Sequence, residues 1–404
     1  MTPAEATTET LVLVSDLHMG PGHGARTEPF HADAAFAAWL EQLRRRAGDD
    51  ERVMLVLLGD IVDFTLVTLP GGGRLDMSAA AAVPKLRCVA AGHADVFRAL
   101  GRLAAAGVPL HLIPGNHDLE WLLPEVREEL RAALGRAAGA PIRPIAFHPW
   151  MLHVPGTMYA EHGHQQHDLN RVPALARLGG GRRIPQSAVP AGTHLSEWMV
   201  ATSEAVDPGG SAPPSTATIA AALRRHPARL LLAAAPTVRL AAGVARWSVA
   251  SAIGRRRTTR GLDDTAVAHV AAAAGAPGEA LVAVDRSAGH GPMGTAARIA
   301  RDLRARRHGT APVPGGYLDD AARRLNARLK RTGDDVPFYV FAHSHVAADR
   351  PLDSSARILN TGTWSTFVLG GAEAWTFVEL RRGRDGVSGG AYRWDGDRKT
   401  PLRS

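Results

Sequence analysis

The amino-acid sequence predicts an α/β fold that is interrupted by a long, mainly helical insertion. In the first third of the chain, short apolar runs typical of buried strands alternate with apolar residues spaced three and four apart, as in amphipathic helices. Strand-like runs return near the C-terminus, whereas the segment between them contains none comparable. Because 404 residues exceed the usual size of a single hydrophobic core, we expect one large domain with an insertion, or two domains.

The expected core is built from the two ends of the chain. Amphipathic helices are expected around Phe36 to Leu43, Val96 to Leu103 and Leu318 to Leu329. We assign residues 9–170 and 335–404 to the core and residues 171–334 to a mainly helical insertion or cap. Strands are expected at residues 11–15, 53–58, 110–113, 150–154, 157–160, 338–341, 356–359 and 375–380.

Composition limits the classes of protein and compartment. The formal net charge is +8 and the sequence pI about 10.4, which favours phosphate, nucleic acid or anionic lipid as partners. Only Lys85, Lys330 and Lys399 are lysines among the 47 basic residues, so an arginine-rich coding bias accounts for the charge equally well. Cys88 is the only cysteine, which excludes an intrachain disulfide and a cysteine-rich zinc site. With no secretory signal visible at the N-terminus, a cytoplasmic protein is expected.

One segment of the insertion, Leu230 to Ile253, is mostly apolar and is flanked by arginines. Pro236, Arg239 and Arg246 interrupt it, so a transmembrane span is not favoured. Two interpretations stay open. The segment is a helix lying on an anionic membrane surface, which would place the protein peripherally at the inner face of the membrane, or it is a helix packed on the core with a solvated arginine face.

Five short polar clusters follow predicted strands. Because ligands bind outside the carboxyl ends of strands in open α/β sheets, the clusters are expected to converge. Their Asp, Asn and His side chains suit Mn²⁺, Fe²⁺ or Zn²⁺, and Mn²⁺ is favoured. The number of candidate ligands indicates two divalent ions bridged by a carboxylate. Asp60 is the candidate for this bridge. The clusters are Asp16-Leu17-His18, Gly59-Asp60-Ile61-Val62-Asp63, Gly115-Asn116-His117-Asp118, Glu161-His162-Gly163-His164 and Ala342-His343-Ser344-His345.

The order D-x-H, G-D-x-x-D, G-N-H-D, H-G and H-x-H resembles the calcineurin-like metallophosphoesterase superfamily. This resemblance implies a four-layer αββα sandwich and hydrolysis of a phosphoester or phosphoanhydride bond by a metal-bridging hydroxide. It implies that His117 lies beside the leaving group, oriented by Asp63. By the same resemblance, Asp16, His18 and His345 bind the first metal, Asn116, His162 and His343 bind the second, and Asp60 binds both.

Departures from the family pattern limit the choice of substrate. Ala342 replaces the usual glycine of the last motif, and Phe64 replaces the arginine of protein Ser/Thr phosphatases. The motif forms and the helical insertion resemble the UDP-2,3-diacylglucosamine pyrophosphatase branch, although that branch has arginine where this chain has His117. The expected substrate is a small phosphorylated metabolite, a nucleotide-sugar or a lipid-linked molecule.

His164, His167 and Asn170 are expected to support the metal ligands or to contact substrate. Two other functions stay open. One is a metallophosphoesterase nuclease. The net positive charge suits a nucleic-acid substrate, but no stretch of alternating aromatic and basic residues marks a groove for single-stranded nucleic acid. The other is a binding scaffold without catalysis. The sequence indicates neither the substrate nor the oligomeric state.

Overall fold

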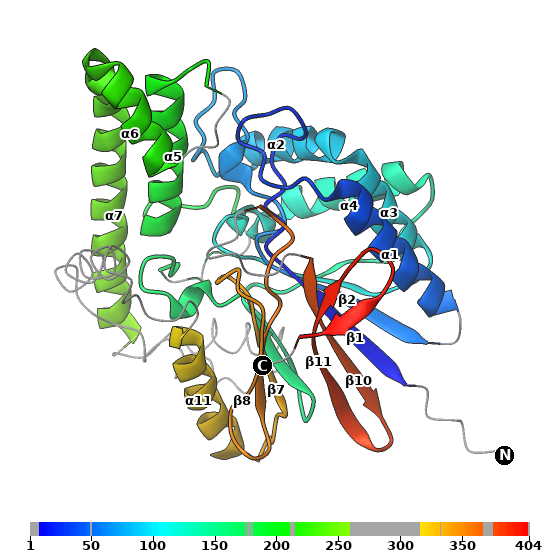
Figure 1. Ribbon diagram of the computed structural model, residues 1–404. Coiled ribbons are helices and arrows are strands. Elements are labelled where there is room, and N and C mark those ends of the chain that lie inside the picture. The colour runs from blue at the N-terminus through cyan, green and yellow to red at the C-terminus, as the bar shows by residue number, and fades with distance from the viewer. Residues whose placement is uncertain are drawn as a thin grey trace.

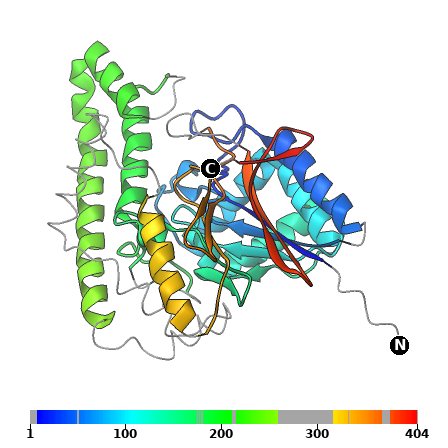
Figure 2. The ribbon, with the colours of Figure 1, turned by 60° about the horizontal axis from the view of Figure 1, so that its bottom comes forward.

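The computed structural model describes residues 8–48, 51–173, 175, 178, 181–210, 215–258, 316–331, 333–366 and 375–402. Two β-sheets face each other at its centre, with helices α1 to α4 beside one sheet and α11 beside the other (Figure 1). A separate group of helices, α5 to α7, stands to one side of the sheets in both views (Figures 1 and 2).

The first sheet has seven strands in the order β12-β11-β10-β1-β2-β3-β4. Its strands β1 to β4 are parallel, and β10 pairs antiparallel with β1, so that the C-terminal meander extends the N-terminal half of the sheet. The strands are β1 (Glu9–Val14), β2 (Arg52–Leu58), β3 (Leu110–Ile113), β4 (Ala146–Phe147), β10 (Thr376–Gly383), β11 (Gly386–Trp394) and β12 (Lys399–Pro401).

The second sheet has five strands in the order β5-β6-β7-β9-β8. Strands β6, β7 and β9 are parallel, and the two edge strands are antiparallel to their neighbours. The parallel pairing joins segments that are far apart in sequence, because β6 precedes the insertion and β7 follows it. The strands are β5 (Met151–Val154), β6 (Met158–Glu161), β7 (Phe338–Phe341), β8 (Ala348–Pro351) and β9 (Arg357–Asn360).

Alternating side chains explain why these apolar runs form a sandwich. In β1, Leu11 and Leu13 enter the core shared by the two sheets, whereas Val12 and Val14 face the helices. Residues of β7 alternate in the same way, because Val340 lies between the sheets and Phe341 points to the other face. Strands buried on both faces need apolar residues at every position, as observed. The predicted four-layer αββα fold is confirmed.

Helices cover the outer face of each sheet. The first sheet is covered by α1 (Asp33–Gly48), α2 (Ala79–Gly92), α3 (Ala94–Ala105) and α4 (Pro124–Ala138). The apolar stripe of α11 (Gly316–Arg331) is buried through Leu318, Leu325 and Leu329 in the same cluster as Tyr339 and Phe341 of β7. In this structure α11 therefore forms the fourth layer, although the sequence places it at the end of the insertion.

The described part of the insertion is helical. It consists of α5 (Ala191–Val206), α6 (Thr216–Arg225), the 3₁₀ segment η5 (Pro227–Ala233) and α7 (Ala234–Thr258). Ion pairs join it to core loops: Arg74 contacts Glu204 at 2.6 Å, and Arg26 contacts Asp207 at 3.9 Å. Residues 259–315 of the predicted insertion lie outside the described residues, and the domain boundaries given above stay a prediction.

Candidate metal centre

The five polar clusters predicted from the sequence lie together. Each follows a parallel strand at its carboxyl end: β1, β2 and β3 in the first sheet, and β6 and β7 in the second. The loops are joined by hydrogen bonds between backbone and side chains. The backbone N–H of His343 donates to Asp16 Oδ2 at 3.1 Å, and that of His117 donates to Asp60 Oδ1 at 2.8 Å. The two sheets thus meet at one site.

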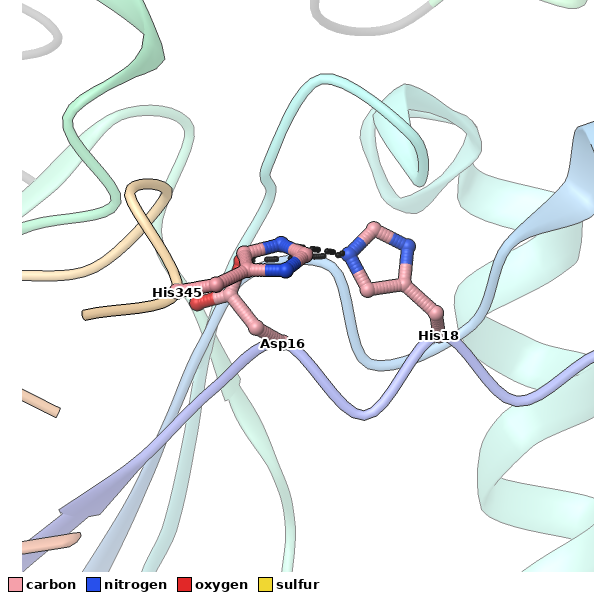
Figure 3. Close-up of side chains that lie close together, drawn as sticks. All are labelled: Asp16, His18 and His345. Atoms are coloured by element: carbon pink, nitrogen blue, oxygen red, sulfur yellow. Dashed lines mark hydrogen bonds and ion pairs between the residues drawn. The ribbon is translucent and has the colours of Figure 1, made fainter. Parts of the chain in front are cut away.

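Asp16, His18 and His345 form the first group of predicted ligands, as Figure 3 shows. Nε2 of His345 lies 3.1 Å from Asp16 Oδ1 and 3.1 Å from Nε2 of His18. The loop after β7 therefore brings an imidazole to the loop after β1. Three donor atoms within 4.8 Å of one another can bind a single cation.

Asp60, His162 and His343 form the second group of predicted ligands. His162 Nδ1 donates to the backbone carbonyl of Leu58 at 2.8 Å, which fixes the tautomer and leaves Nε2 directed at Asp60 Oδ2, 3.2 Å away. Asp60 Oδ2 also lies 3.7 Å from His18 Nε2 of the first group. Asp60 is thus close to both groups, as a bridging ligand would need to be.

His117 and Asp63 lie beside the first group. Asp63 Oδ2 is 2.9 Å from His117 Nδ1 and 3.3 Å from His18 Nδ1, while Asp63 Oδ1 accepts hydrogen bonds from the backbone and hydroxyl of Thr65. A buried carboxylate therefore orients two imidazoles at once. The contact to His18 was not predicted, and it directs His18 Nε2 towards Asp16 and Asp60.

Left-handed backbone conformations are concentrated at this site. Six described residues other than glycine have a positive φ, and five of them are predicted metal ligands. A side chain in this region costs of order 1–3 kcal/mol, so the surrounding contacts must hold these residues in place. The five ligands, with φ between 51° and 66°, are Asp16, His18, Asp60, His343 and His345.

At two positions of the motifs, neighbouring atoms leave no room for a side chain larger than that of glycine. A Cβ at Gly59, where φ is +84°, would lie 2.6 Å from His162 Nδ1. A Cβ at Gly115 would lie 2.1 Å from Asp60 Oδ1. Both glycines therefore allow the ligand loops to approach one another closely. Ala342, which replaces the usual glycine of the last motif, is fully buried with the inter-sheet core, where its methyl group is accommodated.

The site concentrates negative charge that is balanced by imidazoles. Burial opposes ionisation of Asp60, but nearby His162 and His117 outweigh it and hold its pKa well below the usual value. Burial likewise disfavours the charged form of His162, yet Asp60 and Asp16 raise its pKa to about 9. The pKa of His117 rises to about 10 against burial because Asp63 and Asp60 are close. The carboxylates of the site therefore favour positive charge at its centre.

The donor atoms fit divalent transition metals. Asn116 Oδ1 is buried without a hydrogen-bond partner among the described residues, and the buried Asp16 Oδ1 and His162 Nε2 face only other predicted ligands, His345 and Asp60. An unsatisfied buried polar atom costs about 1–3 kcal/mol, and a cation would remove that cost. All three belong to predicted ligands. Carboxylate, amide oxygen and imidazole together match the preferences of Mn²⁺, Fe²⁺ and Zn²⁺.

The three residues predicted to support the ligands lie around the second group. Asn170 Nδ2 is 2.9 Å from His343 Nε2, and the His167 ring lies 5.4 Å from that of His343. His164 is buried 5.5 Å from the His162 ring, and both of its nitrogens lack hydrogen-bond partners among the described residues. Their roles as supporting or substrate-contacting groups stay predictions.

Sequence reasoning missed three features of the site. Asp118 accepts hydrogen bonds from the backbone of Gly115 and Ile61, and so ties the second and third loops together. Thr363, after β9, donates to the carbonyl oxygen of Asp16 at 2.7 Å. Tyr317 of α11 packs edge to face on His167, 5.1 Å between ring centroids. Asp118 belonged to a recognised motif, whereas Thr363 and Tyr317 carry no local signal.

The chain was compared with known protein families, sequences and structures. Residues 10–199 match the calcineurin-like phosphoesterase family. A crystal structure of a dimetal phosphatase from Danio rerio is similar at 12% sequence identity and a TM-score of 0.31, covering 94% of this chain and 98% of that one. No curated protein sequence matches the chain.

Proposed function

We propose that the chain, whose residues 10–199 match the calcineurin-like phosphoesterase family, is a dinuclear metallophosphoesterase that hydrolyses a small phosphorylated metabolite, a nucleotide-sugar or a lipid-linked phosphate. One observation carries the proposal. Carboxylates, an amide and imidazoles from five separate loops converge at the sandwich edge, and Asn116 Oδ1 is buried there without a hydrogen-bond partner among the described residues. We propose Asp16, His18 and His345 as ligands of one cation, Asn116, His162 and His343 as ligands of the other, and Asp60 as the bridge.

The chain's own residues supply the remaining chemistry. When bound, two divalent cations supply charge neutralisation and a hydroxide nucleophile at neutral pH. His117 is not among the proposed ligands, and Asp63 holds its Nδ1 at 2.9 Å, so that Nε2 is the nitrogen that can donate a proton to a leaving oxygen. The His117 side chain is 13% exposed, which permits contact with substrate.

Hydrolysis of p-nitrophenyl phosphate, of its bis ester and of single-stranded DNA, with Mn²⁺ added, tests this function and separates it from a nuclease. His117→Ala is expected to retain metal and to lose roughly a hundredfold in rate, because proton transfer by a positioned group contributes about that much. His31→Gln, at an exposed histidine outside the ligand groups, is the control. Metal binding without turnover of any phosphoester would favour the scaffold alternative.

A membrane surface is a second proposed partner. The helical stretch Pro227–Ser251 is by length and composition able to span a membrane, with a mean hydropathy of 1.4 and 17% of its most apolar window buried. In both views α7 is the outermost helix (Figures 1 and 2). Its exposed positions include a row spaced three and four apart, which contains only alanine and valine: Ala234, Val238, Ala241, Ala245 and Val249.

Arg239 and Arg246 of α7 do not occupy this exposed row. Arg239 and Arg246 lie to one side of it and line a cavity shared with α5. Both arginines are exposed, as in the sequence-based interpretation with a solvated arginine face, and the apolar row lies beside them. Leu230, Leu231 and Leu232 in η5 are 62%, 82% and 52% exposed, and the exposed Arg224 and Arg225 precede them. Apolar side chains next to arginines complement an anionic lipid surface.

Sedimentation with phosphatidylglycerol vesicles at low salt tests this contact. The triple variant Leu231→Gln, Val238→Gln, Val249→Gln is expected to lose binding, whereas Leu195→Gln, at a 40% exposed leucine of α5, is expected to retain it. Equal sedimentation of both variants, or no binding by the unaltered chain, would remove the proposal. The cytoplasmic localisation, the manganese preference and the UDP-2,3-diacylglucosamine pyrophosphatase branch stay predictions.

A further inference from the structure

A cavity of about 710 Å³ lies outside the metal centre, between the core loop that contains Arg74 and the insertion helices α5 and α7. Ligand-binding cavities in proteins usually measure about 300–1,000 Å³. Six of its fourteen lining residues are charged, three arginines and three acidic residues. The residues that matter below are Arg74, His194, Glu197, Glu204, Arg239 and Arg246.

His194 of α5 is a buried donor or acceptor in the wall of this cavity. The residue is 3% exposed, and its Nε2 has no hydrogen-bond partner among the described residues. Gly243 of α7 makes room for the ring, since a Cβ there would lie 2.4 Å from His194 Nδ1. Burial, and next the nearby charge of Arg246, lowers the pKa of His194 to about 4, so the ring is neutral at pH 7. A buried ring nitrogen without a partner is costly unless a ligand satisfies it.

The arginines of the cavity differ in whether their charge is already balanced. Arg74 contacts both carboxylate oxygens of Glu204 at 2.6 Å, and Arg239 lies 3.6 Å from Glu197. Arg246 is exposed and makes no ion pair within the described part of the chain. Its guanidinium group is therefore available to an anion in the cavity.

The cavity and the metal centre share structural supports. Thr193, next to His194, donates to the backbone carbonyl of Asn116 at 3.2 Å. Arg74 donates to the carbonyl of Thr65, and Thr65 in turn donates to Asp63. The start of α5 thus contacts a proposed ligand loop on one side and contributes to the cavity on the other.

We propose that this cavity binds a small organic anion, a carboxylate or a phosphate that also carries hydroxyl groups. Arg246 pairs with the anion, His194 donates a hydrogen bond from Nε2, and Glu197 accepts hydrogen bonds from the hydroxyl groups. Guanidinium and imidazole donors are well suited to carboxylate and phosphate oxygens. The proposal goes beyond the proposed hydrolysis, because this binding needs neither a divalent cation nor turnover.

Calorimetric titration of the full chain tests the proposal, with glycerol 3-phosphate and glycerate as probes. Both probes carry hydroxyl groups and differ in the anion. The titrations are done on Asp60→Asn protein, so that the metal centre does not compete and cannot hydrolyse the phosphate. At least one probe is expected to bind, and the one that binds more tightly identifies the anion.

In the same background, Arg246→Gln is expected to weaken binding roughly tenfold to a hundredfold, as loss of a charge-assisted hydrogen bond does. Arg224→Gln removes the same charge at an exposed position on α6 and is expected to change affinity less than twofold. Because Arg246 is exposed, its variant is expected to unfold at the same temperature as the Arg224→Gln control. Equal affinity of the two variants, or no binding of either probe up to about 10 mM, would overturn the proposal.

Discussion

Replacing Gly115 by alanine should disturb the metal centre through a single methyl group. The Cβ would lie 2.1 Å from Asp60 Oδ1 and 2.7 Å from both Asp60 Cγ and the Asp60 backbone nitrogen. Atoms this close cannot coexist, so either the Asp60 carboxylate or the loop after β3 must move. Gly115 does not have a positive φ, and the effect is therefore steric rather than conformational.

The size of the effect follows from the contacts that Asp60 would lose. Its Oδ1 accepts a hydrogen bond from the backbone of His117 at 2.8 Å, and loss of a hydrogen bond to a charged group costs about 1.5–3 kcal/mol. Overpacking of a buried site costs a further 1–3 kcal/mol or so. Gly115→Ala should therefore destabilise the fold by roughly 2.5–6 kcal/mol and displace the proposed bridging ligand.

Urea unfolding, metal content and hydrolysis of p-nitrophenyl phosphate measure the three consequences on one preparation. Gly135→Ala is the matched control. Gly135 lies within α4, and a Cβ there would be 3.7 Å from the carbonyl oxygen of Ala140, an ordinary van der Waals distance. That change should be neutral or should stabilise the protein by up to about 1 kcal/mol, because alanine favours helix over glycine. If Gly115→Ala retained full stability, metal and activity, the close approach of the two loops would be refuted.

Two further predictions concern buried charges near the site and away from it. Asp118→Ala removes the acceptor for the backbone N–H groups of Gly115 and Ile61. The free energy of unfolding, measured by urea titration, should therefore fall by about 2–4 kcal/mol. An unchanged value would contradict the conclusion that Asp118 stabilises the two loops. His93 is fully buried between Asp33 and Glu28, and despite burial these carboxylates raise its pKa to about 9. A raised pKa stabilises the fold below about pH 6.5, and this contribution, roughly 3 kcal/mol, should disappear as the pH rises through 9. Unfolding curves at pH 6 and pH 10 should show a larger drop for the unaltered chain than for His93→Gln, and equal drops would argue against the charged histidine.

Much of the core could be predicted from the sequence, because strands buried on both faces leave continuous apolar runs. All eight expected strands are present within a few residues of their predicted ends. The structure adds four that were not predicted. Strand β11 (Gly386–Trp394) contains glycines that weaken any strand signal, β8 ends at Pro351 on a sheet edge, and β4 and β12 are two and three residues long. Helix α2 was also missed, since Pro84 lies inside it.

More of the residues that lie together at the candidate site could be predicted from the sequence than of the contacts around it. Every proposed metal ligand lies in one of two neighbouring groups or, for Asn116, in the adjoining loop, because each motif directly follows a parallel strand. Contacts between distant loops left no such signal. The hydrogen bond from Thr363 to Asp16 and the packing of Tyr317 on His167 depend on how the second sheet and α11 dock. The orientation of Arg239 and Arg246 depends in the same way on how α7 packs on α5.

The metal content of the purified, folded chain tests the central claim most directly. After incubation with Mn²⁺ and removal of the free ion, the account predicts two Mn²⁺ per chain, and a clear loss of metal in Asp60→Asn because that residue is proposed to bind both ions. A folded chain that retains no divalent cation, or an Asp60→Asn variant that retains both, would contradict the account.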